Sequence, residues 1–221
     1  MITEKNVART IYLSLIMQLT TTLISLDGLN YDLNEKDYVL REILILEAFV
    51  QFVEAFFYIW VILALKDLKI MTSRRYIDWF ITTPTMLVST IVFFEYLNNK
   101  SKTIRLVDFI KENKQDVLKI VSYNFMMLLF GLLGELQIID NKIAVTIGFI
   151  FFYLTFKLIY DKYAYKTKEG MKLFNFLVVV WSLYGIAALM PLKAKNISYN
   201  MLDIVSKNFY GLFIYYTIRN L

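Results

Sequence analysis

Seven long apolar runs separated by polar joints are the feature of this sequence that most restricts its fold. The runs cover residues 10–26, 43–65, 76–94, 117–133, 143–159, 173–192 and 197–218. Each approaches the roughly 20 residues that an α-helix needs to cross a bilayer core about 30 Å thick. The alternation of membrane-spanning β-strands is missing over these lengths. The pattern therefore predicts an all-α membrane protein, a single seven-helix domain over residues 1–221.

Composition excludes the main alternatives to a membrane protein. Hydrophobic residues make up 58% of the 221 residues and aromatic residues 17%, more than a soluble domain of this length can bury. The same aromatic content excludes a disordered chain. The sequence has no cysteine and no histidine, which excludes disulfide scaffolds and thiolate or imidazole metal sites. Because nucleotide-binding and catalytic-triad motifs are also missing, we expect neither an enzyme nor a metal site.

The charged residues indicate a lipid bilayer rather than nucleic acid as the partner. The formal net charge is +5, and the Lys and Arg residues flank the apolar runs instead of forming a basic helix. The joints after the first, third and fifth runs hold more Lys and Arg than the joints on the other side. Since such residues favour the cytoplasmic side, the N-terminus is predicted to lie outside. The polar start of the chain predicts no cleavable signal peptide.

Several apolar runs contain ionisable residues near their middle, where charge is costly and marks functional positions. The second run contains Glu47 and Glu54, the third Asp78, and the seventh Asp203 and Lys207. Asp203 and Lys207 are four residues apart, so they share a helix face. A buried lysine beside a carboxylate either stays charged within the pair or loses its proton through desolvation. A desolvated lysine amine is suited to forming a Schiff base with an aldehyde or ketone.

Two motifs at these residues resemble those of microbial (type 1) rhodopsins. Residues 75–84 are similar to the third-helix signature of that family, and residues 202–207 are similar to its seventh-helix signature, in which the lysine binds retinal. The segments 175–184 and 127–134 also resemble the sixth and fourth helices. The resemblance covers all seven runs in order, about 200 residues. The triplet Asp78, Thr82 and Ser89 gives an Asp-Thr-Ser third-helix code, and the chain resembles the viral rhodopsin branch.

The resemblance implies a role for each of these residues. Lys207 would bind all-trans retinal covalently as a protonated Schiff base, with Asp78 and Asp203 as counterions and Arg75 balancing their charge. Asp78 would also accept the proton. Trp79 and Trp181 would enclose the polyene, because flat apolar rings suit a flat apolar ligand. The remaining pocket residues would be Tyr76, Thr82, Thr83, Met86, Met127, Gly131 and Tyr184. The tryptophan that relatives carry in the fifth helix is missing, so that wall of the pocket is undefined.

Other residues predict a path for ions. Ser89 stands where efficient proton pumps carry a carboxylic acid that returns a proton from the inside, and serine cannot do this. Polar side chains at helical spacing form one stripe on the second run and one on the first, and two such facing stripes can hold water and attract cations. The stripes are Glu47, Gln51 and Glu54 on the second run, and Ser14, Gln18 and Thr21 on the first.

The sequence leaves several functions open. We expect light-driven ion transport, with an outward proton pump that uses Asp78 as acceptor ranked above a light-gated cation channel that uses the Glu47 and Glu54 stripe. A sensory photoreceptor that signals through a partner ranks third, and a retinal-free membrane scaffold last. The transported species would be protons or monovalent cations. Because relatives often form trimers or pentamers, a homo-oligomer is expected.

Overall fold

The computed structural model describes residues 3–63, 65 and 67–221, and this part of the chain contains helices and no β-strand. Six helices in it are long and apolar enough to cross a membrane. Their bounds are α1 (Glu4–Gly28), α2 (Tyr38–Ile62), α3 (Leu68–Asn98), α5 (Lys114–Glu135), α6 (Asn141–Lys162) and α7 (Lys168–Ala188). The second run was predicted to end at residue 65, whereas α2 ends at Ile62, and residue 64 lies outside the described residues.

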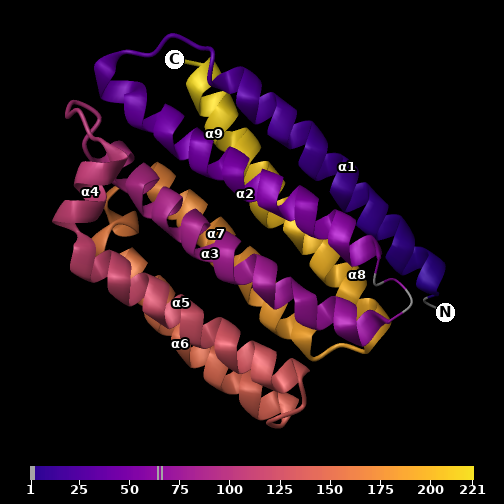
Figure 1. The fold of residues 1–221 in the computed structure, drawn as a ribbon. Coiled ribbons are helices and arrows are strands. Elements are labelled where there is room, and N and C mark those ends of the chain that lie inside the picture. Colours follow the sequence, from indigo (N-terminus) through magenta and orange to yellow (C-terminus); the bar gives the residue numbers. More distant parts are fainter. Residues whose placement is uncertain (1–2, 64, 66) are drawn as a thin grey trace.

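The seventh span consists of three consecutive helical segments that follow one another along the bundle (Figure 1). They are α8 (Leu192–Asp203), the π-helical segment η3 (Ile204–Asn208) and α9 (Phe209–Arg219). A π-helical turn holds one more residue than an α-helical turn, and such turns are frequent at functional sites. The segment η3 contains Lys207, so the irregular turn lies at the lysine singled out from the sequence. The prediction of a seven-helix membrane fold is confirmed.

The helices form a closed bundle with a defined interior. Along the chain α1 contacts α2, α2 contacts α3, α3 contacts α5, α5 contacts α6, and α6 contacts α7. The seventh span closes the ring because α8 contacts both α7 and α1. Figure 1 shows the indigo helix α1 and the yellow helix α9 along one side of the bundle and the α5–α6 pair along the opposite side. The seventh span therefore faces α1, α2, α3 and α7, and it lies far from α6.

Short elements fill the joints between the spans. These are η1 (Glu35–Asp37), α4 (Leu106–Glu112) and η2 (Ala164–Lys166). Helix α4 was not predicted, because it is only seven residues long and lies in a polar joint. Its start is fixed by Glu42 of α2, which accepts hydrogen bonds from the Leu106 backbone N–H at 2.7 Å and from Arg105 Nε at 2.9 Å. Phe109 of α4 is buried and anchors the helix to the bundle.

Helix α2 exposes large apolar side chains and buries polar ones. On α2, Phe52 and Phe56 are 63% and 70% exposed on the outside of the bundle. Glu47, Gln51 and Glu54 of the same helix are fully buried. Apolar side chains that face outward need hydrocarbon around them, and buried polar groups need partners inside the bundle. The chain is therefore an integral membrane protein whose interior holds buried polar groups beside an apolar core.

Helices α5 and α6 approach most closely at Gly134. A Cβ atom added at Gly134 would lie only 2.5 Å from Ala144 Cβ. Small residues at such positions allow helix backbones to come together inside a membrane. We predict that Gly134→Val lowers the free energy of unfolding by about 1–3 kcal/mol through overpacking, measured by thermal unfolding in detergent. The second substitution Ala144→Gly should recover part of the loss, and equal stability of Gly134→Val and the unsubstituted chain would contradict this packing.

Candidate functional site

The centre of the bundle holds one lysine among three carboxyl groups. Lys207 Nζ lies 2.8 Å from Asp78 Oδ2 of α3 and 2.8 Å from Glu54 Oε1 of α2. Asp203 Oδ1 of α8 is 3.7 Å from the same nitrogen. All four side chains are at least 98% buried. The sequence predicted Asp78 and Asp203 beside Lys207, whereas it predicted Glu54 only as part of a transport path.

A second buried cation lies on the far side of Asp203. Arg75 Nη1 is 3.1 Å from Asp203 Oδ2, and the same oxygen accepts a hydrogen bond from the Tyr58 hydroxyl at 2.7 Å. The Tyr184 hydroxyl donates to Asp203 Oδ1 at 2.8 Å. Arg75 also donates to the side-chain oxygen of Asn200. Arg75 therefore balances Asp203, while Lys207 is held chiefly by Asp78 and Glu54.

The charges of this cluster do not cancel by themselves. Two cations, Lys207 and Arg75, face three carboxyl groups, those of Glu54, Asp78 and Asp203. An uncompensated charge in a bundle interior costs several kcal/mol. The cluster is neutral only when one carboxyl group holds a proton or when a further cation lies beside it. It is thus a place where a proton or a small cation is favoured.

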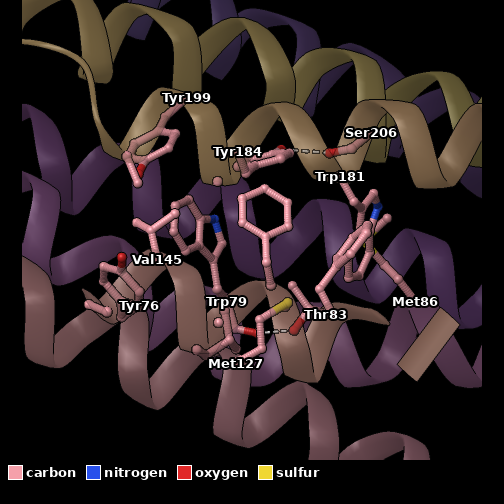
Figure 2. A pocket seen from close by; sticks show the side chains of 18 of the residues that line it. Tyr76, Trp79, Thr83, Met86, Met127, Val145, Trp181, Tyr184, Tyr199 and Ser206 are labelled. Atoms are coloured by element: carbon pink, nitrogen blue, oxygen red, sulfur yellow. Dashed lines mark hydrogen bonds between the residues drawn. The ribbon is translucent and has the colours of Figure 1, made fainter. Parts of the chain in front are cut away.

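A largely apolar cavity borders the lysine cluster and extends between α3, α5, α6 and α7. Figure 2 shows Trp79 and Trp181 on opposite sides of this cavity. Trp79 packs edge-on against Tyr184 and Tyr199, with ring centroids 5.5 Å and 5.0 Å away. Eight of the predicted pocket residues line the cavity together with Lys207: Tyr76, Trp79, Thr83, Met86, Met127, Gly131, Trp181 and Tyr184.

The structure changes the predicted pocket at three places. Thr82 is not among the lining residues, and its hydroxyl donates at 3.0 Å to the backbone carbonyl of Asp78 rather than to the carboxylate. Tyr199 of α8 lines the cavity but was not predicted, because nothing in its local sequence distinguishes it. The wall that lacks the family tryptophan is formed by α6 residues: Ala144, Val145, Gly148, Phe149 and Phe152.

The cavity fits the retinal that the sequence motifs imply. Retinal is a long apolar polyene with an aldehyde at one end. The cavity has aromatic and sulfur-containing walls, and a buried lysine amine lies at its border. Helix α6, which closes the opposite end, is distant from the seventh span that carries Lys207. The residues present thus provide an amine for the aldehyde and flat apolar surfaces for the polyene.

Buried polar side chains continue from the lysine cluster along α1, α2 and the seventh span. Glu54 of α2 contacts Lys207, and Gln51, one turn earlier, accepts a hydrogen bond from Ser25 of α1 at 3.1 Å. Glu47, a further turn earlier, accepts a hydrogen bond from the Ser89 hydroxyl of α3. We call these side chains and their partners the polar column: Ser14, Gln18, Thr21, Ser25, Glu47, Gln51, Glu54, Ser89, Asn200 and Asn208.

Asparagines of the seventh span form hydrogen bonds with the polar stripe of α1. The Ser14 hydroxyl donates to the backbone carbonyl of Asn200 at 3.1 Å. Asn208 Nδ2 donates to Gln18 at 2.8 Å and also to Thr21. Asparagines of the seventh span thus occupy the position between the stripes, and their amide groups reach α1 because they are longer than the hydroxyls opposite. The polar column therefore draws its side chains from α1, α2, the seventh span and, through Ser89, α3.

Lys195 lies near the start of α8 and has a carboxylate partner. The structure places Lys195 Nζ of α8 2.8 Å from Glu135 Oε2 at the end of α5, and both side chains are nearly buried. Since its partner is a carboxylate, Lys195 ties two helices together at this end of the bundle.

Substitutions at two neighbouring arginines of α3, Arg75 and Arg74, test whether Arg75 balances the charge of Asp203. We predict that Arg75→Gln lowers the free energy of unfolding by about 3–5 kcal/mol, because it leaves Asp203 without its buried cation. Arg74→Gln is the matched control: the Arg74 guanidinium lies over the Trp60 ring at 4.3 Å and is only partly buried. Its loss should cost at most about 1 kcal/mol. Thermal unfolding of both variants measures the difference, and equal effects would contradict the assignment.

Comparison with known proteins agrees with this geometry. The family model described as bacteriorhodopsin-like protein matches residues 9–221. No curated protein sequence gives a significant match. The crystal structure of viral rhodopsin OLPVRII is similar to this chain, with 29% identity, a TM-score of 0.86, and coverage of 97% of this chain and 98% of that one.

More distant solved structures share the fold. Blue light-absorbing proteorhodopsin from Med12 is 20% identical, with a TM-score of 0.76 and 97% coverage of both chains. The light-driven proton pump of Coccomyxa subellipsoidea is 18% identical, with a TM-score of 0.72 and 98% coverage of both chains. The family match covers nearly the whole chain, and it agrees with the motifs around Asp78 and Lys207. The chain therefore belongs to the bacteriorhodopsin-like family, the microbial rhodopsins.

Proposed function

We propose that this protein is a light-gated cation channel in which all-trans retinal is bound covalently to Lys207 as a Schiff base. One observation carries the choice of channel: Glu54 of α2 lies 2.8 Å from Lys207 Nζ and is also a member of the polar column. Lys207, which would carry the chromophore, therefore contacts the polar column directly. In a proton pump the lysine needs only an acceptor such as Asp78, and Glu54 has no required role.

The residues of the cavity hold the chromophore. Trp79 and Trp181 restrict its sides, and Met86, Met127 and Gly131 leave room for its chain. Retinal bound there supplies the absorption of visible light and a change of shape that reaches the lysine nitrogen. The carboxylates that contact this nitrogen, Glu54 and Asp78, then determine how the protein responds to that change of shape.

The lysine pairs provide the switch. Without retinal, the Lys207 ammonium donates to both Glu54 and Asp78 at 2.8 Å. A protonated Schiff base at this nitrogen would keep a single N–H and would donate to one of these two carboxylates, so a change in its direction would break that hydrogen bond. If the bond to Glu54 breaks, a buried carboxylate remains without a partner. Such a carboxylate attracts the nearest mobile cation, and the polar column provides its route. Protons and monovalent cations are the species that this route admits.

The second candidate is the outward proton pump, and a specific contact favours it as well. Asp78 is placed to accept a proton from Lys207 at 2.8 Å. Ser89 itself cannot supply a proton, but it donates a hydrogen bond to the fully buried Glu47, so a carboxyl group does lie beside this position. That carboxyl group comes from α2 instead of α3. A pump with Glu47 as internal donor is therefore the alternative.

We also propose a domain extent, a membrane orientation and an oligomeric state. Residues 1–221 act as one membrane-embedded domain, with the N-terminus and the Arg75 end of the cluster outside and the Glu47 end inside. The protein is a photoreceptor and transporter rather than an enzyme. It forms a homo-oligomer, a trimer or a pentamer.

We predict that the purified protein absorbs visible light after addition of all-trans retinal and that Lys207→Ala does not. The reason is that Lys207 is the amine beside the cavity. Lys193→Ala is the control, because Lys193 is an exposed lysine near the start of α8. Absorption spectra before and after retinal addition make the measurement. A visible band of normal intensity in Lys207→Ala would remove the basis of the assignment.

We predict that Glu54→Gln reduces the light-activated conductance at least roughly tenfold, as if a barrier rose by about 1.4 kcal/mol. Loss of the carboxylate removes both the partner of Lys207 and the cation-attracting group of the column. Whole-cell photocurrents at fixed voltage are the measurement. Glu42→Gln is the control, because Glu42 lies on the same helix but binds Arg105 and the start of α4. Unchanged photocurrents in Glu54→Gln would favour the pump.

A further inference from the structure

Gly211 of α9 provides a recess for the side chain of Gln51. A Cβ atom added at Gly211 would collide with Gln51 Nε2 and would lie 3.2 Å from Gln51 Cδ. It would also lie 3.7 Å from Glu47 Cβ. The first contact is closer than any van der Waals contact, so the end of the Gln51 side chain would have to leave this position if residue 211 carried a Cβ atom. Nothing in the retinal cavity explains this glycine, since Gly211 does not line it.

The amide of Gln51 lies across the polar column. Gln51 is fully buried, and its Oε1 accepts a hydrogen bond from Ser25 of α1 at 3.1 Å. Along α2 it lies about 4.5 Å from the level of Glu54 and about 6 Å from that of Glu47. The side chain thus spans from α2 toward α1 and α9 between the two carboxyl groups of the column.

Gln51 and Glu54, three residues apart on α2, each have one buried polar atom without a hydrogen-bond partner in the described part of the chain. Gln51 Nε2 and Glu54 Oε2 are both buried, and neither has a hydrogen-bond partner among the described residues. Gln51 Nε2 is a donor and Glu54 Oε2 is an acceptor. In the structure Glu54 is held by Lys207 through its other oxygen, and Gln51 is held by Ser25.

We propose that Gln51 is the inner barrier of the ion path and that Gly211 is the positioning residue that seats it. The inference rests on the proposed transport function and names the residue that closes the path on the inner side of Lys207. The Lys207 contact fixes the position of the Glu54 carboxylate, so its release lets Glu54 move toward Gln51 and accept a hydrogen bond from Gln51 Nε2. The amide then leaves its place between Ser25 and Gly211, and the column becomes continuous from Glu54 to Glu47.

The seating is tested on the full chain without retinal. Alanine in a helix interior is ordinarily more stable than glycine, so Gly211→Ala alone should raise stability if the recess has no role. We expect instead that Gly211→Ala lowers the thermal unfolding midpoint by about 3 °C or more. In the background of Gln51→Ala the same substitution should raise the midpoint, because the clashing amide is gone. The same sign of change in both backgrounds would overturn the seating by Gly211.

The barrier is tested on the pigment in the dark. Hydroxylamine in water bleaches the pigment by attacking the lysine linkage, so its rate reports access of water to Lys207. We expect Gln51→Ala and Gly211→Ala each to raise the dark bleaching rate by roughly fivefold, the effect of losing one buried hydrogen bond. The double variant should not exceed Gln51→Ala alone. Phe52→Ala is the control, since Phe52 is the next residue of α2 and faces outward.

The outcomes separate this inference from the proposed function. Normal pigment with bleaching rates equal to that of the unsubstituted chain in all variants overturns the barrier and leaves retinal binding intact. Failure of the unsubstituted chain to form pigment removes the proposed function, and the barrier with it. Raised bleaching rates in both variants, with no further rise in the double variant and with the opposite stability effects in the two backgrounds, support the proposal.

Discussion

A lysine buried at the centre of a bilayer must be paired, and the rest of this structure follows from that requirement. Three helices each supply a carboxyl group near Lys207: Glu54 from α2, Asp78 from α3 and Asp203 from α8. Removing one partner from such a cluster is costly because the remaining charge stays out of water. Each of these three helices therefore turns a carboxylate toward the lysine. The tightly packed helices α5 and α6 supply no charge to the cluster and form the far wall of the cavity.

The same cluster joins two compartments of different chemistry. On one side lies the aromatic cavity, whose residues suit an apolar polyene. Along the bundle lies the polar column, whose amides and carboxyl groups suit water and cations. Lys207 borders the first and Glu54 belongs to the second, so in the proposed function their contact links light absorption to transport. This contact is the reason why we now prefer the channel, although the sequence alone favoured the pump.

Local sequence patterns predicted the membrane spans and singled out Lys207. The contacts between helices could not be predicted in the same way. Seven apolar runs and the spacing of Asp203 and Lys207 are local features, and both survive in the structure. The approach of Glu54 to Lys207 joins residues 153 positions apart and depends on helix rotation. The contact of Glu47 with Ser89 is of the same kind. Helix α4 was not predicted because seven residues in a polar joint show little hydrophobic periodicity. The contact of the Gln51 side chain with Gly211 joins residues far apart in the sequence, so only the three-dimensional structure reveals it.

The most direct test of the account is the photocurrent of the unsubstituted protein as a function of voltage, recorded with different sodium or potassium concentrations on the two sides of the membrane. A channel conducts in either direction according to the driving force. The account predicts a current that reverses sign near the equilibrium potential of the cation and shifts with its gradient. A current that stays outward across the whole voltage range, whatever the cation gradient, would contradict the channel and support the pump built on Asp78 and Glu47.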